Sequence, residues 1–187
     1  MNPPRLATKN DMPRVYELIQ ELAIFEKEPD AVEVTVSQLI EDGFGKIPKF
    51  VCFVVEVENK VEGLALIYTR YSTWKGEVIH LEDLIVSQAS RGKGLGTVLL
   101  DEVVKYGKQK GVKRISWEVL DWNEPAIEFY EKKGANVMRD WNVVQMDRLV
   151  DDIMSFSQLS QNTGTIQKVD LNTILERVVF SLEEKIK

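Results

Sequence analysis

Apolar side chains recur at helical spacing in two stretches near the N-terminus. The first stretch begins at Asn10 or Asp11, and both residue types favour a helix N-cap. Four apolar residues then fall on one face of the helix, namely Val15, Leu18, Ile19 and Leu22. In the second stretch, Thr35 and Gln38 have the spacing of a capping box, which predicts a short helix that ends at Gly43.

Three strand-like runs follow, at residues 50–57, 61–70 and 77–86. The first two are separated only by the polar residues 58–60, which predicts an antiparallel hairpin with a tight turn. The third run ends just before a glycine-rich loop at residues 90–96.

Beyond this loop, helical and strand-like patterns alternate. The patterns predict a helix at 95–111, a strand at 112–119, a shorter helix at 123–134 and a last strand or pair of strands at 135–147. No internal repeat is present. Helices, an antiparallel meander and then this alternation predict the α/β class, with a mixed sheet and helices on both faces.

The character of the sequence changes near residue 147. Residues 148–159 form a short amphipathic pattern, and a polar linker separates them from a strong amphipathic helical pattern at 170–187. We therefore expect one domain at residues 1–147, followed by a helical C-terminal extension at residues 148–187.

Composition narrows the class of protein. Of the 187 residues, 44% are hydrophobic and 29% are charged, which is typical of a soluble globular protein. The net charge of −6 argues against nucleic acid as the main partner. No apolar run approaches the roughly 18 residues that a membrane helix needs. The N-terminus has no apolar signal core, and Cys52 is the only cysteine. We expect a cytoplasmic protein without a disulfide, a cysteine zinc cluster or another metal site.

The loop SRGKGLG, at residues 90–96, places three glycines and two cations between a strand and a helix. Backbone N–H groups in such a loop, at the positive end of a helix dipole, suit a phosphate group. A dinucleotide fingerprint and an ATP P-loop both require other spacings, so neither matches. Taken alone, the loop slightly favours a plain tight turn over a ligand site.

Four segments place this loop in a family. LIQELAIFE (18–26), LIEDGFG (39–45), HLEDLIVSQASRGKGLG (80–96) and DWNEPAIEFYEKKGA (121–135) resemble, in order and spacing, one branch of the GCN5-related N-acetyltransferases (GNAT). This branch contains the diamine, or spermidine/spermine-type, N-acetyltransferases. The resemblance covers residues 5–147 and implies the GNAT fold, with acetyl-CoA as the co-substrate.

The resemblance implies cofactor roles for three groups of residues. Leu84, Ile85 and Val86 would supply backbone hydrogen bonds to the pantetheine, and the N–H of Leu84 would polarise the thioester carbonyl. The pyrophosphate would lie on the loop residues Arg91, Gly92, Lys93, Gly94, Leu95, Gly96 and Thr97. Asn123 and Ala126 would line the cofactor wall, and Asn123 is an equally good helix N-cap.

Two residues carry the chemistry in this resemblance. Tyr130 matches the tyrosine that protonates the departing thiolate, and Glu82 matches the carboxylate that binds the acceptor ammonium and removes its proton through water. Neighbours in a regular strand face opposite sides of the sheet, so only one of Glu82 and Asp83 is expected in the acceptor site. Asp83 is left without a role. His80 shares a face with Glu82, and we prefer a partly buried strand residue there to a general base.

Two residues of the expected acceptor pocket differ from those of the polyamine enzymes. Phe25 and Glu26 match a Tyr-Glu pair that lines the pocket, so one hydroxyl is lost, and Ser72 stands where those enzymes tend to have aspartate. We expect acetyl transfer, in a ternary complex, to the primary amine of a small cationic acceptor such as a diamine or polyamine.

Other functions stay open. The same chemistry could serve another amine, such as a lysine analogue, an aminoglycoside or a protein N-terminus, and a non-catalytic CoA-binding sensor or scaffold is a further alternative. The resemblance also implies a homodimer. Residues 148–187 resemble a piece of sensor histidine kinases, but the phosphoacceptor histidine and the ATP-binding boxes are absent, so no kinase activity is implied.

Overall fold

The structure, a computed structural model, describes residues 3–145. The chain divides into two units, residues 1–134 and 135–187, and the described helices and strands all belong to the first. In chain order they are β1 (Arg5–Leu6), a 3-10 turn (Lys9–Asp11), α1 (Met12–Phe25), α2 (Val36–Phe44), β2 (Val51–Val57), β3 (Lys60–Ser72), β4 (Gly76–Val86), a second 3-10 turn (Gln88–Ser90), α3 (Leu95–Lys110), β5 (Ile115–Ser116) and α4 (Glu124–Lys132).

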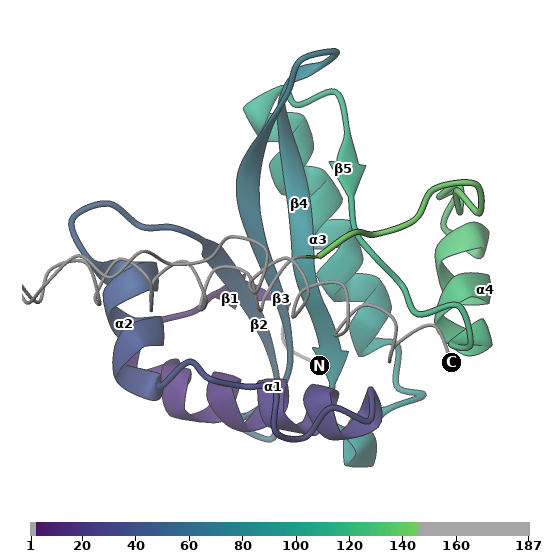
Figure 1. Cartoon of the computed structure of the whole chain (residues 1–187). Helices are drawn as coiled ribbons and strands as arrows, with labels where there is room; N and C mark the ends of the chain where they lie inside the picture. The colour runs from purple at the N-terminus through teal and green to yellow at the C-terminus, as the bar shows by residue number, and fades with distance from the viewer. Residues whose placement is uncertain (1–2, 146–187) are drawn as a thin grey trace, which may run out of the picture. The chain divides into compact units, whose positions relative to one another are not determined.

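The five strands of this unit form one mixed sheet in the order β1-β2-β3-β4-β5 (Figure 1). Neighbours from β1 to β4 are antiparallel, whereas β4 and β5 are parallel. The turn between β2 and β3 forms at Glu58 and Asn59, whose φ angles are 52° and 63°. Positive φ at two successive residues is the geometry of a tight hairpin turn. The predicted mixed sheet and the predicted hairpin are therefore confirmed.

Helices cover both faces of the sheet (Figure 1). On one face, Val15 and Leu18 of α1 are fully buried in a cluster that includes Leu64 of β3. Side chains alternate along a strand, so Gly63 faces the opposite side, where it lies against Leu99 of α3. Each fully buried apolar side chain contributes about 1.5–3 kcal/mol, which holds the helices on the sheet.

Strand β4 contains one extra residue. Leu81 and Asp83 pair with consecutive residues of β3, so Glu82 between them has no partner in the ladder. An extra residue of this kind is a β-bulge, which bends the strand and interrupts the alternation of side chains. On its other edge, β4 pairs with β5 only through Ile79 and His80. The bulge therefore lies just beyond the point where β5 leaves β4.

The caps agree with the sequence pattern, with one shift. The N–H of Gln38 donates to Thr35 Oγ1 at 3.2 Å, and the side chain of Gln38 accepts from the N–H of Thr35 at 2.8 Å, which confirms the capping box. The helix continues to Phe44 and is capped by Gly45, two residues after the predicted end at Gly43.

Two predicted strands differ from the structure, and one short strand was missed. The strand predicted at 112–119 is only Ile115–Ser116, because its pairing with β4 stops before the bulge. Residues 135–145 contain no strand. The strand was predicted from large apolar residues, which are exposed in the structure: Met138, Trp141, Val143 and Val144. No described element therefore packs on these side chains. The strand Arg5–Leu6 was missed, because two residues are too few to show a pattern. The predicted domain boundary at 147 and the extension at 148–187 lie outside the described residues.

Gly63 tests the packing of α3 on the sheet. A Cβ at this position would lie 3.0 Å from the carbonyl oxygen of Ile85 and 3.1 Å from Cδ1 of Leu99. We predict that Gly63→Ala lowers the free energy of unfolding by about 1–3 kcal/mol in urea titrations, because the added methyl group overpacks the interface. Gly96→Ala is the matched control, since its Cβ would meet nothing closer than 3.9 Å. An equal loss in both variants would contradict this packing.

Candidate active site

The C-terminal half of β4 has two different edges. Leu84, Ile85 and Val86 pair with β3 on one edge, and pairing on the other edge ends at His80. Figure 1 shows β5 and the segment that leads to α4 diverging from β4. Backbone N–H and C=O groups are obligatory hydrogen-bonding groups. Those that point toward this edge of β4 have no strand partner among residues 3–145, so they suit a ligand that lies along the strand.

The glycine loop follows β4 after the short 3-10 turn Gln88–Ser90. Gly92 and Gly94 have φ angles of 76° and 79°, a region that other residues rarely adopt, and Gly94 is the N-cap of α3. No atom lies within 4 Å of the Cβ position at either glycine. The first N–H groups of the helix, those of Leu95, Gly96 and Thr97, have no partner within the helix and lie at its positive end. This open cradle fits a pyrophosphate.

The two cations of the loop are held by near neighbours. Arg91 Nε donates to the carbonyl oxygen of Val86 at 3.3 Å, and its guanidinium lies 5.1 Å from the ring centroid of Phe25. Lys93 Nζ donates to Ser90 Oγ at 3.4 Å. Both cationic side chains remain exposed, so they are accessible to an anion. The Arg91–Phe25 contact also ties the loop to the end of α1.

Glu62 of β3 supports the base of the loop, and the sequence analysis missed it. Its backbone carbonyl accepts a hydrogen bond from the N–H of Ser87 at 2.8 Å, and its buried carboxylate lies 3.1 Å from Lys60 Nζ. Burial alone would raise the pKa of Glu62, but hydrogen bonds from Lys60 and Ser90 lower it overall. The only signal in the sequence was one carboxylate inside an apolar run.

Helix α4 positions Tyr130 and Asn123. The Tyr130 ring is 8% exposed and packs at 5.0 Å from the ring of Trp117 and 5.2 Å from that of Phe129, measured between centroids. Burial raises the pKa of Tyr130 to about 12, so the hydroxyl keeps its proton at neutral pH. Asn123 is the N-cap, and its Oδ1 accepts from the N–H of Ala126 at 3.4 Å. The capping role of Asn123 is therefore confirmed.

Glu82 and Asp83 lie on the same face of the sheet, which corrects the prediction that they face opposite sides. Asp83 pairs with Leu66, a member of the core cluster on the α1 side. Glu82 Oε2 lies 3.6 Å from Nε2 of His80, and His80 pairs with Tyr68 on that same side. The prediction assumed strict alternation, and the bulge at Glu82 interrupts it.

These carboxylates form a negative cluster with Glu26. Burial raises the pKa of Asp83 to about 7, and the charges of Glu82 and Glu26 add to the effect. Partial burial also raises the pKa of Glu26. Like charges that are close together destabilise one another, and a bound cation relieves the repulsion. The cluster is therefore suited to an ammonium group.

Trp122 closes the side of the site between α1 and α4, and it was not among the predicted residues. Its ring lies 5.6 Å from the ring of Phe25, and Lys27 Nζ lies 4.8 Å from its centroid. Phe25 thus contacts the loop through Arg91, and the charge of Glu26 acts on Asp83. Their role in an acceptor pocket stays a prediction.

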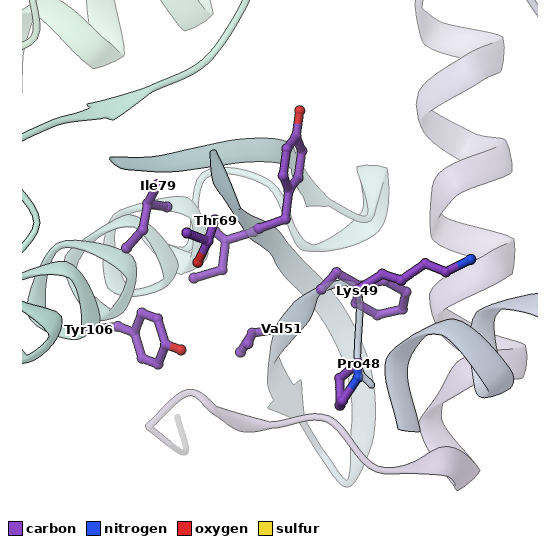
Figure 2. A pocket seen from close by; sticks show the side chains of 9 residues that line it. Pro48, Lys49, Val51, Thr69, Ile79 and Tyr106 are labelled. Atoms are coloured by element: carbon purple, nitrogen blue, oxygen red, sulfur yellow. The ribbon is translucent and has the colours of Figure 1, made fainter. Parts of the chain in front are cut away.

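A separate hollow of about 250 Å³ lies elsewhere on the sheet (Figure 2). Its lining includes Pro48, Lys49, Val51, Thr69, Ile79 and Tyr106. None of the predicted site residues lines this hollow, so the candidate active site is the unpaired edge of β4 rather than this hollow.

Metal ligands, membrane-spanning helices and a reactive cysteine were each sought among the described residues. No group of three histidine, cysteine, aspartate or glutamate residues in residues 3–145 is placed to hold a metal ion. No helix in that part of the chain has the length and apolar character needed to cross a membrane. Cys52 is 5% exposed, and burial raises the pKa of its thiol to about 12, so it is a core residue.

Comparisons with known proteins agree with the fold. The model of the acetyltransferase (GNAT) family matches residues 12–135. Thialysine N-epsilon-acetyltransferase of Bos taurus is 37% identical over 139 residues, which cover 70% of this chain and 82% of that protein. Spermidine/spermine N(1)-acetyltransferase-like protein 1 of Homo sapiens is 32% identical over 154 residues, which cover 77% of this chain and 22% of that protein.

A solved structure has a similar fold. The Vibrio cholerae integron cassette protein VCH_CASS6 has a TM-score of 0.67 at 19% identity, over 81% of this chain and 96% of that one. The resemblance of residues 148–187 to sensor histidine kinases is not borne out by these comparisons. Because the family model spans more than half of the chain and the relatives are N-acetyltransferases, the chain belongs to the GNAT family and is an acetyl-CoA-dependent N-acetyltransferase.

Proposed function

We propose that the enzyme transfers the acetyl group directly from acetyl-CoA to the primary amine of a small cationic acceptor, in a ternary complex. The observation that carries the proposal is the cluster of Glu26, Glu82 and Asp83 beside the unpaired edge of β4. A cation-binding group and a cofactor-binding edge are then adjacent, which is the arrangement that direct transfer requires.

Three parts of the chain would hold the co-substrate, which supplies an activated thioester. Backbone groups of Leu84, Ile85 and Val86 would bind the pantetheine along β4. The loop Arg91–Thr97 would bind the pyrophosphate, because its glycines leave open space above free N–H groups. Asn123 Oδ1 is already used in the helix cap. The cofactor-binding wall would therefore be completed by Asn123 Nδ2 and by the backbone of Ala126.

The acceptor must lose protons before and during attack. An alkyl ammonium has a pKa of about 10.4, so it arrives protonated, and Glu82 would bind it and accept its first proton. A C–N bond then forms and the C–S bond breaks. Tyr130 would donate a proton to the departing thiolate, and the second amine proton would restore the Tyr130 hydroxyl through solvent. The thiol thus carries the proton from Tyr130, the second amine proton replaces it on Tyr130, and the first amine proton leaves to water.

A lysine-like amino acid is a second candidate for the acceptor class, and Arg70 favours it. Arg70 lies on the same face of β3 as Tyr68, two residues away. Burial and the charge of Glu82 raise the pKa of Tyr68, whereas the charge of Arg70 lowers it. The Arg70 guanidinium therefore acts on groups of the acceptor face. An amino acid offers a carboxylate to Arg70, whereas a polyamine has none. The thialysine-acetylating relative agrees with this choice.

The proposal also includes a homodimer in the cytoplasm. Tyr71 and Trp74, at the turn between β3 and β4, are 74% and 80% exposed, and large exposed aromatic residues suit a subunit interface. The buried, unpaired thiol of Cys52 is compatible with a reducing compartment.

Tyr130→Phe tests the general acid. Removing the hydroxyl while keeping the ring should lower kcat about 10²–10⁴-fold, because the thiolate then leaves without a positioned proton donor. The dissociation constant for CoA should stay unchanged in calorimetry. A parallel loss of turnover and CoA affinity would mean that Tyr130 holds the cofactor instead of protonating the thiolate.

Asp83→Asn tests the electrostatics of the carboxylate cluster. The folded pKa of about 7 lies above the unfolded value of 3.8, so the folded protein binds this proton more tightly. Stability from Asp83 is therefore complete below about pH 4 and is lost as the pH rises to 7. In thermal melts, the Tm of the variant should rise relative to wild type across that window and level off above it.

Asp101→Asn, at an exposed position on α3, is the matched control for the loss of one carboxylate. Wild-type and Asp83→Asn curves that stay parallel from pH 4 to pH 7 would show that the cluster does not perturb Asp83.

Arg70→Gln tests the acceptor class with a matched pair of substrates. Lysine and cadaverine differ only in the carboxylate, and a charge-assisted hydrogen bond is worth about 1.5–3 kcal/mol. Arg70→Gln should therefore raise KM for lysine or thialysine about 10–100-fold and leave KM for cadaverine unchanged, with products identified by mass spectrometry. Equal effects on both acceptors, or acetylation of polyamines alone, would exclude the amino-acid class.

A further inference from the structure

A row of three polar side chains crosses the acceptor face of the sheet. Tyr68 of β3, His80 of β4 and Ser116 of β5 are register partners, so their side chains lie on the same face. The rings of Tyr68 and His80 are 5.1 Å apart, between centroids. The row meets the acceptor site at Glu82, whose Oε2 lies 3.6 Å from His80 Nε2.

Two atoms in this row are buried and have no hydrogen-bond partner among the described residues. These atoms are Nδ1 of His80 and Oγ of Ser116, and His80 is only 7% exposed. Side chains of register partners on adjacent strands are about 5 Å apart at their origins. Nδ1–H can donate to a hydroxyl oxygen, so a change of side-chain rotamer could pair these two atoms without a change in the backbone.

We propose that His80 is a positioning residue that receives the acceptor's proton from Glu82, and that Ser116 fixes the imidazole tautomer required for this relay. The inference rests on the proposed acetyl transfer and deepens it. Nδ1–H donates to Ser116 Oγ, which leaves the lone pair of Nε2 directed toward Glu82. An imidazole nitrogen that carries a lone pair can accept a proton.

The relay conserves protons and charge. The ammonium gives one proton to the Glu82 carboxylate. The O–H bond of the resulting acid then breaks as an N–H bond forms at Nε2, which gives an imidazolium beside a regenerated carboxylate. After the product leaves, the imidazolium returns the proton to water through Glu82, whose side chain is 52% exposed. Glu82 is thus free to hold a cation while the proton is stored on His80.

Several titratable groups surround His80 on this face of the sheet. The titratable groups on this face are Glu82 and Asp83 of β4, Tyr68 and Arg70 of β3, Arg114 and Glu118 on either side of β5, and Glu26 at the end of α1. Among these groups, carboxylates outnumber guanidinium groups. Tyr68 adds the face of its ring, which also attracts a cation.

Nuclear magnetic resonance tests the tautomer without any substitution. His80 is the only histidine in the chain, so the imidazole ¹⁵N signals of labelled protein belong to it alone. Above the titration of the ring, we expect the tautomer with the proton on Nδ1, and Ser116→Ala should shift the population toward the other tautomer. An imidazole that carries its proton on Nε2 in the wild-type protein would overturn the proposal.

The pH dependence of kcat tests the relay in turnover. We expect His80→Gln to lower kcat about 10–100-fold, to move the acidic limb of the profile to lower pH and to leave CoA affinity unchanged. The double variant with Glu82→Gln should lose little more than Glu82→Gln alone, because both residues act on one proton. Tyr68→Phe keeps the ring packing and is the control that should leave the limb in place.

Different results would overturn the proposed acetyl transfer and the proposed His80 relay. A wild-type enzyme that acetylates no amine would overturn the proposed function and the relay together. A wild-type enzyme that turns over, with an acidic limb that His80→Gln does not move and with additive losses in the double variant, would overturn the relay alone and leave His80 as a packing residue.

Discussion

The site depends on strand β4, whose outer edge loses its partner halfway along its length. Pairing with β5 ends at His80, and from there to Val86 the strand pairs with β3 alone among residues 3–145. A sheet edge with free N–H and C=O groups in the interior of a fold is costly unless something binds there. Because β4 also leads into the glycine loop, the free edge and the phosphate cradle are consecutive in the chain. One pantetheine-bearing ligand can therefore use both.

The bulge at Glu82 adds the acceptor chemistry to this cofactor edge. Without it, Glu82 and Asp83 would face opposite sides, and only one carboxylate would be available. With it, both lie on the α1 side, where Glu26 increases the negative charge and burial keeps the pKa of Asp83 high. In the proposed function, a cation site, a proton acceptor and the thioester would lie within a few residues of one strand.

Sequence patterns predicted the parts of the fold that rest on local rules. The capping box at Thr35, the hairpin turn at residues 58–60 and the long helices all followed from spacing and residue type. The bulge did not, because an extra residue in a strand depends on its partner and leaves the apolar pattern nearly intact. Glu62 and Trp122 were missed for a similar reason, since their roles arise from contacts between elements that are distant in the chain.

Hydrogen–deuterium exchange with and without acetyl-CoA is the most direct test of the central claim, because it reports on backbone N–H groups individually. We expect acetyl-CoA to slow exchange at residues 84–86, on the edge of β4 that no strand among residues 3–145 covers, and at residues 91–97 in the loop. We expect no such protection around Pro48 and Lys49, in the separate hollow. Protection at the hollow, or an unchanged exchange rate at residues 84–86, would contradict the account.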